Sequence, residues 1–156
     1  MAFSRRSMLW MVPGATLAVP MGSLLFPGAA RAAQVNAEDG IAVRGTDVVA
    51  YVTDRRPVPG RAEFTHMWQG ATWRFASAAN RDRFAADPAR YAPAYGGFCA
   101  YAVSEGYTAT IDPAAWRIVD GRLYLNYDRS VQRRWEQDIP GRIARADTNW
   151  PSLAAQ

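Results

Sequence analysis

Residues 64–75 read FTHMWQGATWRF, and this stretch decides the fold. Two short runs rich in aromatic and β-branched residues stand on either side of Gln69 and Gly70. A two-residue turn that contains glycine, set between two such runs, is typical of a β-hairpin. The stretch therefore predicts two antiparallel strands, residues 64–68 and 71–75.

Alternation along the strands predicts which side chains of this hairpin share a face. Successive side chains of a strand point to opposite faces, and a two-residue turn fixes the cross-strand pairs. The expected pairs are Trp68 with Ala71, His66 with Trp73, and Phe64 with Phe75. One face then carries Phe64, His66, Trp68, Trp73 and Phe75, and the other carries Thr65, Met67, Thr72 and Arg74. His66, the single histidine of the chain, thus falls in an otherwise apolar row.

Two short helical segments are predicted directly after the hairpin. Ser77 is a candidate N-cap for a helix through about Ala86, because its hydroxyl can accept a hydrogen bond from the first helical turn. Phe84 and Ala85 are expected to point inward from this helix. Asp87 then precedes a short helical turn over residues 88–91.

The C-terminal half predicts a second hairpin and two further helices. An Asp-Gly pair, Asp120 and Gly121, is a strong hairpin turn between residues 116–119 and 123–127. Ser130 is expected to begin a helix through about Ile139, and Pro140 a second one that ends near Asn149. The paired glycines Gly96 and Gly97 indicate an unusual turn or a close backbone approach.

These elements predict a small single α+β domain with two β-hairpins and several short helices. We expect the domain to span residues 46–150. A flexible lead, residues 33–45, would precede it, and a tail, residues 151–156, would follow. Residues 47–52 are apolar but too few to decide between a helical turn and a strand.

The first 32 residues have the pattern of an export signal. Arg5 and Arg6 precede an uncharged apolar stretch, and small residues at Ala30 and Ala32 fit a cleavage site after Ala32. The pattern is typical of a twin-arginine signal and predicts a periplasmic protein with no stable membrane span after cleavage. An uncleaved N-terminal anchor is the alternative.

The charge distribution argues against a nucleic-acid partner. The chain has a net charge of +4 with 18 basic and 14 acidic residues, but three of the arginines lie in the first 32 residues, which leaves 15 against 14, or +1. A nearly neutral folded part lacks the basic surface that binds a polyanion.

Residues 64–77 and 80–91 together resemble the YHS domain family. The most specific part of the resemblance is the run from Phe84 through Asp87-Pro88 to Tyr91, and residues 92–150 are similar to exported proteins of YHS type. The resemblance implies a YHS-like core. In members that carry cysteines it also implies handling of soft metals, but the corresponding positions here hold Ala50, Ala76 and Asn80.

Two side chains remain as candidates for chemistry, His66 and Cys99. Either could be a soft-metal ligand, and together they could form a nucleophile and its base. The alternative is that His66 is a core histidine and Cys99 a small buried apolar residue. Two ligands alone leave a copper-type ion half-coordinated. The leading expectation is therefore that the protein has no cofactor, and a copper-type ion is the alternative.

The leading hypothesis is an exported, non-enzymatic binding or accessory module of YHS type. Its ligand would be a small molecule or a periplasmic protein partner. The pocket is expected near the glycine pair, with Tyr95, Gly96, Gly97 and Tyr101 as its residues. Copper-type metal binding through His66 and Cys99, and an enzyme that uses the same pair, are the alternatives.

Overall fold

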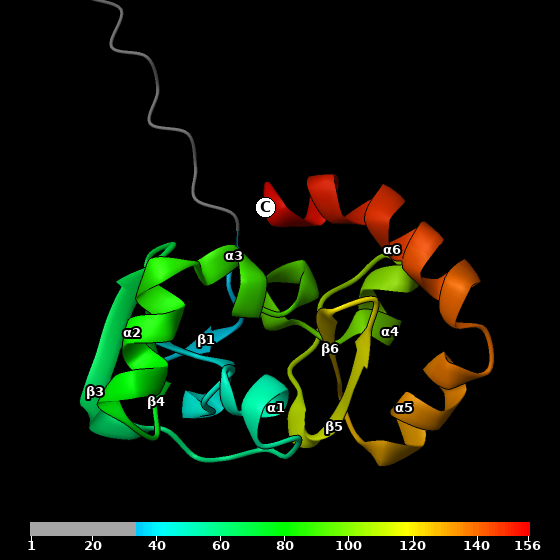
Figure 1. The fold of residues 1–156 in the computed structure, drawn as a ribbon. Coiled ribbons are helices and arrows are strands. Elements are labelled where there is room, and N and C mark those ends of the chain that lie inside the picture. The colour runs from blue at the N-terminus through cyan, green and yellow to red at the C-terminus, as the bar shows by residue number, and fades with distance from the viewer. Residues whose placement is uncertain (1–33) are drawn as a thin grey trace, which may run out of the picture.

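Two β-sheets and the helices packed on them make up residues 34–156, the part of the chain that the computed structural model describes (Figure 1). The mixed content of helix and strand confirms the predicted α+β class. The export signal expected at residues 1–32, with Arg5, Arg6 and the cleavage after Ala32, lies outside the described residues. None of the helices in residues 34–156 is long and apolar enough to cross a membrane.

The first sheet has the strand order β1-β2-β4-β3 and contains the predicted hairpin. Its antiparallel pair is formed by β3 (Arg61–Trp68) and β4 (Ala71–Phe75). Trp68 lies opposite Ala71 and His66 opposite Trp73, as predicted. The pairing of Phe64 with Phe75 was wrong, because the register shifts between Arg61 and Thr65 and Phe75 lies opposite Arg61.

The shift inserts residues 62–64 of β3 between the pairs Arg61–Phe75 and Thr65–Arg74. Just beyond it, β4 leaves the ladder after Phe75. The backbone N–H of the next residue, Ala76, donates to the carboxylate of Asp47 at 2.9 Å instead of to β3. This partner is far away in the sequence, so the hairpin pattern alone could not indicate it. The predicted faces are nevertheless confirmed, since Trp73 and Phe75 are buried while Thr65 and Met67 are exposed.

The segment before the hairpin is built into the core and is not a flexible lead. It contains β1 (Ala37–Glu38), β2 (Ile41–Ala42) and a 3-10 turn, η1 (Val43–Gly45). β2 pairs in parallel with β4, and Ala42 and Val43 are fully buried. Residues 47–52, whose pattern fits a helical turn or a strand equally, contribute to the short helix α1 (Ala50–Thr53).

The helices that follow the hairpin begin where their caps predict. Ser77 caps α2 (Ala78–Ala86) by accepting from the Asn80 N–H, and Asp87 caps α3 (Pro88–Tyr91). Phe84 is fully buried on the sheet, but Ala85 is exposed, so its predicted inward position was wrong. On so short a helix only the row through Asn80 and Phe84 faces the core, and the residue next to Phe84 is turned away from it.

The second sheet is the predicted hairpin of β5 (Asp112–Val119) and β6 (Arg122–Asn126). Asp120 and Gly121 both have positive φ, at 50° and 77°, as their two-residue turn requires. A turn, η2 (Ala94–Gly97), and a short helix, α4 (Ala100–Ser104), connect the two halves of the fold.

The last two helices begin and end differently from the prediction. Asp128, and not Ser130, caps α5 (Arg129–Glu136), because its carboxylate accepts from the Val131 N–H at 2.7 Å. Pro140 does lie in the first turn of α6 (Ile139–Ala154). That helix continues through Pro151 into the expected tail, since Leu153 is buried in the core and holds the last turn in place.

Candidate functional site

The turn η2 has a backbone conformation that residues other than glycine rarely adopt. Tyr95, Gly96 and Gly97 follow one another with φ of 57°, 62° and 83°. A Cβ at Gly96 would overlap the carbonyl oxygen of Gln34. The carbonyl of Gly96 accepts from the backbone N–H of Asn36 at 2.9 Å, and that of Gly97 from its side chain at 3.0 Å. The structure thus shows both an unusual turn and a close backbone approach, as the glycine pair indicated.

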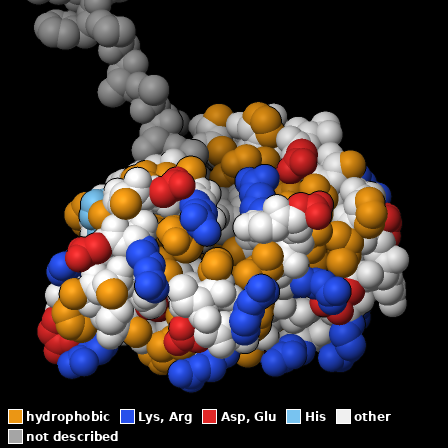
Figure 2. All heavy atoms as spheres, in the orientation of Figure 1, with side chains coloured by type: hydrophobic (Ala, Val, Ile, Leu, Met, Phe, Trp, Pro, Cys, Tyr) orange, Lys and Arg blue, Asp and Glu red, His pale blue; other side chains and the backbone are white. Residues whose placement is uncertain are grey.

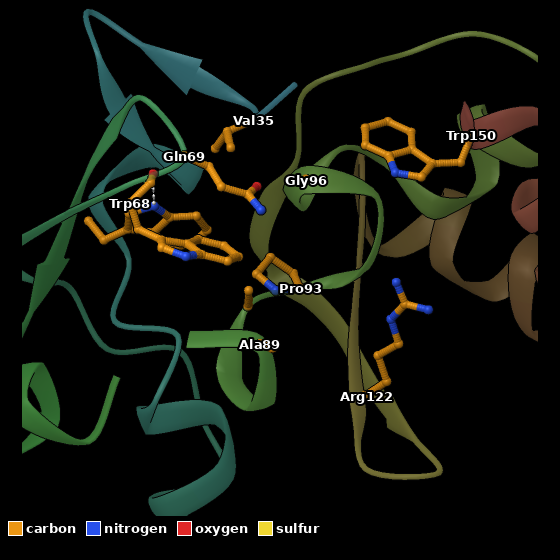
Figure 3. Close-up of a pocket in the computed structure, with 10 residues that line it drawn as sticks. Val35, Trp68, Gln69, Ala89, Pro93, Gly96, Arg122 and Trp150 are labelled. Carbon is orange, nitrogen blue, oxygen red and sulfur yellow. Dashed lines mark hydrogen bonds between the residues drawn. The ribbon is translucent and has the colours of Figure 1, made fainter. Parts of the chain in front are cut away.

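A cavity of about 320 Å³ opens beside this turn (Figure 3). The β3–β4 hairpin and the α3 region form one side, and the start of β6 and the end of α6 form the other. Most of its walls are apolar or aromatic, and Gln69 and Arg122 supply the polar groups. The lining residues are Val35, Trp68, Gln69, Trp73, Ala89, Ala92, Pro93, Gly96, Arg122 and Trp150.

Arg122 places a positive charge at this cavity. Its guanidinium lies over the ring of Tyr95, 5.6 Å from the centroid, and beside that of Tyr124 at 6.0 Å. No carboxylate of residues 34–156 forms an ion pair with it. Burial and a 2.8 Å hydrogen bond to Asp147 raise the pKa of Tyr95, so this ring stays neutral beneath the cation.

The structure brings only one of the four predicted pocket residues to the cavity. Gly96 lines it, whereas Tyr95 and Gly97 are buried behind the wall. Tyr101 lies elsewhere, with its ring 4.1 Å from the Arg142 guanidinium. The sequence interpretation missed Trp68, Trp73, Arg122 and Trp150 as cavity residues, because they come from separate segments that only the fold unites.

Cys99 is a buried structural thiol at the start of α4. It is 1% exposed, its Sγ accepts from the backbone N–H of Tyr127 at 3.2 Å, and it lies 3.8 Å from the Asn126 Oδ1. Burial raises the pKa of the Cys99 thiol, which outweighs the stabilising backbone contacts. The neutral thiol is therefore the dominant form near pH 7.

We expect iodoacetamide to alkylate Cys99 much more slowly in the native protein than in urea, because the reagent needs an accessible thiolate. A pKa raised on folding also means that the native state holds its proton longer than the unfolded state. The free energy of unfolding should therefore fall as the pH rises above about 8.5, the usual pKa of a thiol. Cys99→Ser should lose this part of the pH dependence. Native alkylation as fast as in urea would contradict the assignment.

His66 and Cys99 occupy different parts of the fold. His66 lies on β3, with its ring packed edge-on against Phe84 at a centroid distance of 5.9 Å. Figure 1 shows β3 at one end of the molecule and α4, which Cys99 precedes, well inside the other half. The contacts of His66 are with Phe84, whereas those of Cys99 are with Asn126 and Tyr127. Within residues 34–156, no three His, Cys, Asp or Glu side chains gather as a metal site would need.

The three positions that the YHS resemblance assigns to cysteines gather around the buried carboxylate of Asp47. Its Oδ1 accepts from the N–H groups of Val49 at 2.9 Å and Ala50 at 3.2 Å. Its Oδ2 accepts from the Ala76 N–H at 2.9 Å and the Asn80 amide at 2.8 Å. Soft metals prefer thiolate and imidazole donors. Two alanines, an amide and a carboxylate already engaged by four donors do not fit such an ion.

One comparison with known proteins matches part of the chain. The family model of the YHS domain matches residues 49–95, which run from the start of α1 to the turn η2. No curated protein and no solved structure matches the chain. Six of the ten residues that line the cavity lie inside the matched region, and Val35, Gly96, Arg122 and Trp150 lie outside it. Residues 49–95 therefore match the YHS domain family, and they are built into a larger α+β fold.

Proposed function

We propose that this protein is an exported, non-enzymatic binding module that holds a small ligand in the cavity beside η2. The observation that carries the proposal is the cavity itself. It has aromatic walls on both sides, a guanidinium free of ion pairs in residues 34–156, and a volume within the usual range of small-molecule sites.

A binding role suits the chemistry of the cavity better than catalysis or metal handling does. Its lining contains no Cys, His, Asp or Glu, so it offers neither a nucleophile with a base nor a set of metal ligands. The alternatives that use Cys99 and His66 would require these two side chains to be in contact. The structure does not support such a contact, because His66 packs on Phe84 and Cys99 lies against Tyr127.

The charge on the surface also bears on the kind of partner. On the face drawn in Figure 2, basic side chains lie among acidic and apolar ones and do not gather in one patch. A mixed surface of this kind offers little long-range attraction to a polyanion. We therefore assign the binding role to the cavity and propose no nucleic-acid partner.

Binding can be tested by filling the cavity. We expect Ala89→Trp, which places a bulky ring in the cavity from an exposed position on α3, to weaken the binding of a naphthalene-based probe by at least about tenfold. Fluorescence titration of the full chain measures this. The matched control is Ala85→Trp, an exposed alanine on α2 that does not line the cavity. Equal affinities of the two variants, with native circular dichroism, would contradict the proposal.

The export part of the proposal rests on Arg5 and Arg6. We expect the double variant Arg5→Lys with Arg6→Lys to remain in the cytoplasm, because a twin-arginine signal is read as an address by its receptor. The wild-type protein should appear in the periplasm with the mass of a mature chain whose first residue is Ala33. Arg31→Lys is the matched control and should be exported. Equal periplasmic amounts of the double variant and the wild type would refute this assignment.

A further inference from the structure

The cavity beside η2 combines one positive charge with flat aromatic walls, and this combination limits the chemistry of its ligand. We infer that the ligand is a small aromatic carboxylate, whose carboxylate contacts Arg122 and whose ring lies between the tryptophans. This inference rests on the proposed function and adds the class of ligand to it.

Arg122 supplies the positive charge of the cavity. Its guanidinium is held over the rings of Tyr95 and Tyr124, and no carboxylate of the described chain forms an ion pair with it. Tyr124 forms a side-chain hydrogen bond with this guanidinium, and an arginine carries five N–H donors, so further N–H groups remain for a ligand. Those groups form a planar fork that matches a carboxylate with two parallel hydrogen bonds. A cationic ligand would be repelled here.

The walls favour a flat ring as the body of the ligand. Trp68 stands on one side of the cavity and Trp150 on the other (Figure 3). Trp73 also lines the cavity, with its ring centroid 5.7 Å from that of Trp68. Trp73 is held in place by its own hydrogen bond, since its Nε1 donates to the Trp68 carbonyl at 3.1 Å. Fixed indole rings provide flat apolar surfaces against which an aromatic body gains contact area and ring–ring attraction.

The second polar group lies across the cavity from Arg122. The Gln69 side chain projects into the cavity from the hairpin turn, as Figure 3 shows. Its amide can donate to the far oxygen of a carboxylate or accept from a hydroxyl on the ring. A volume of about 320 Å³ lies at the small end of ligand sites, which suits one or two fused rings.

The experiment compares three probes that share one ring system and differ in charge: 2-naphthoate, 2-naphthalenemethanol and 2-naphthylmethylammonium. Each is titrated into the full chain. We expect the carboxylate to bind at least about tenfold more tightly than the alcohol, and the ammonium to bind weakest. Arg122→Gln should reduce the carboxylate's affinity to that of the alcohol, and Arg122→Lys should give an intermediate value. Arg133→Gln, at an exposed arginine on α5, has the same change in net charge and should leave all affinities unchanged.

The outcomes separate the inference from the proposed function. If the alcohol binds as tightly as the carboxylate, or if Arg122→Gln has no effect, while Ala89→Trp still blocks binding, the carboxylate assignment is wrong and the binding site stands. If none of the probes binds, or if Ala89→Trp changes no affinity, the proposed function itself fails.

Discussion

Replacing Asp47 with alanine is expected to lower the free energy of unfolding by about 4 kcal/mol, because four hydrogen-bond donors lose their acceptor at once. The carboxylate is fully buried and connects the start of α1 with the end of β4 and the start of α2. Each donor left buried without a partner costs roughly 1–3 kcal/mol, reduced where water reaches it. Urea unfolding followed by circular dichroism measures the change.

Two further variants make this test specific. Asp47→Asn keeps the shape of the side chain but turns an amide NH₂ toward groups that are themselves donors, so about half of the loss should remain. Asp82→Ala removes an exposed carboxylate, whose ion pair with Arg81 is on the surface, and should change stability by less than about 0.5 kcal/mol. A loss below about 1 kcal/mol for Asp47→Ala would show that the carboxylate does not hold these elements together.

The second large effect is expected for Gly97→Ala, which should cost about 3 kcal/mol or more. Gly97 has a φ of 83°, where an L-residue other than glycine is strained by about 1 kcal/mol. A Cβ there would also overlap the Cγ1 of Val43, a fully buried residue of the core, and would press on Pro93. Overpacking of a core typically costs a further 1–3 kcal/mol or so.

Gly121→Ala separates the two causes. Gly121 has a similar φ of 77°, but nothing lies within 4 Å of a Cβ placed on it. The strain of positive φ is therefore its main cost, about 1 kcal/mol. Equal losses for Gly97→Ala and Gly121→Ala in urea unfolding would mean that the approach of Val43 to the turn carries no energetic weight.

The parts of the fold that could be predicted are those with a local cause. Gln69-Gly70 and Asp120-Gly121 set two-residue turns by their own backbone preferences, and Ser77 and Asp87 cap the helices that begin beside them. Each signal and its consequence lie within a few residues. The same holds for the α+β class, which follows from the sum of such elements.

The errors share a different cause, which is contact between distant segments. The shifted register of β3 lies next to such a contact, in which the carboxylate of Asp47 accepts from the N–H of Ala76, 29 positions later. The helix α6 passes Pro151 because Leu153 and Trp150 pack on the core and on Tyr95. Proline at this position removes one N–H donor from the helix, and tertiary packing compensates for that loss.

The candidate site was the least predictable part, for the same reason. Gly96 was found because a glycine pair is a local signal, but Trp68, Arg122 and Trp150 are unremarkable in their own segments. The hairpin indicated Trp68 only as a core residue. Arg122 follows a tight turn, where an exposed cation is ordinary. Only the folded chain brings these residues together as the lining of one cavity beside η2.

The most direct test of the account is the response of the indole N–H signals of the ¹⁵N-labelled protein to 2-naphthoate. Binding in the cavity should shift the signals of Trp68, Trp73 and Trp150, whose rings line it, and leave that of the buried Trp135 in place. Shifts that spare the three cavity tryptophans, or no shifts at a saturating concentration of the probe, would contradict the claim that this cavity is the binding site.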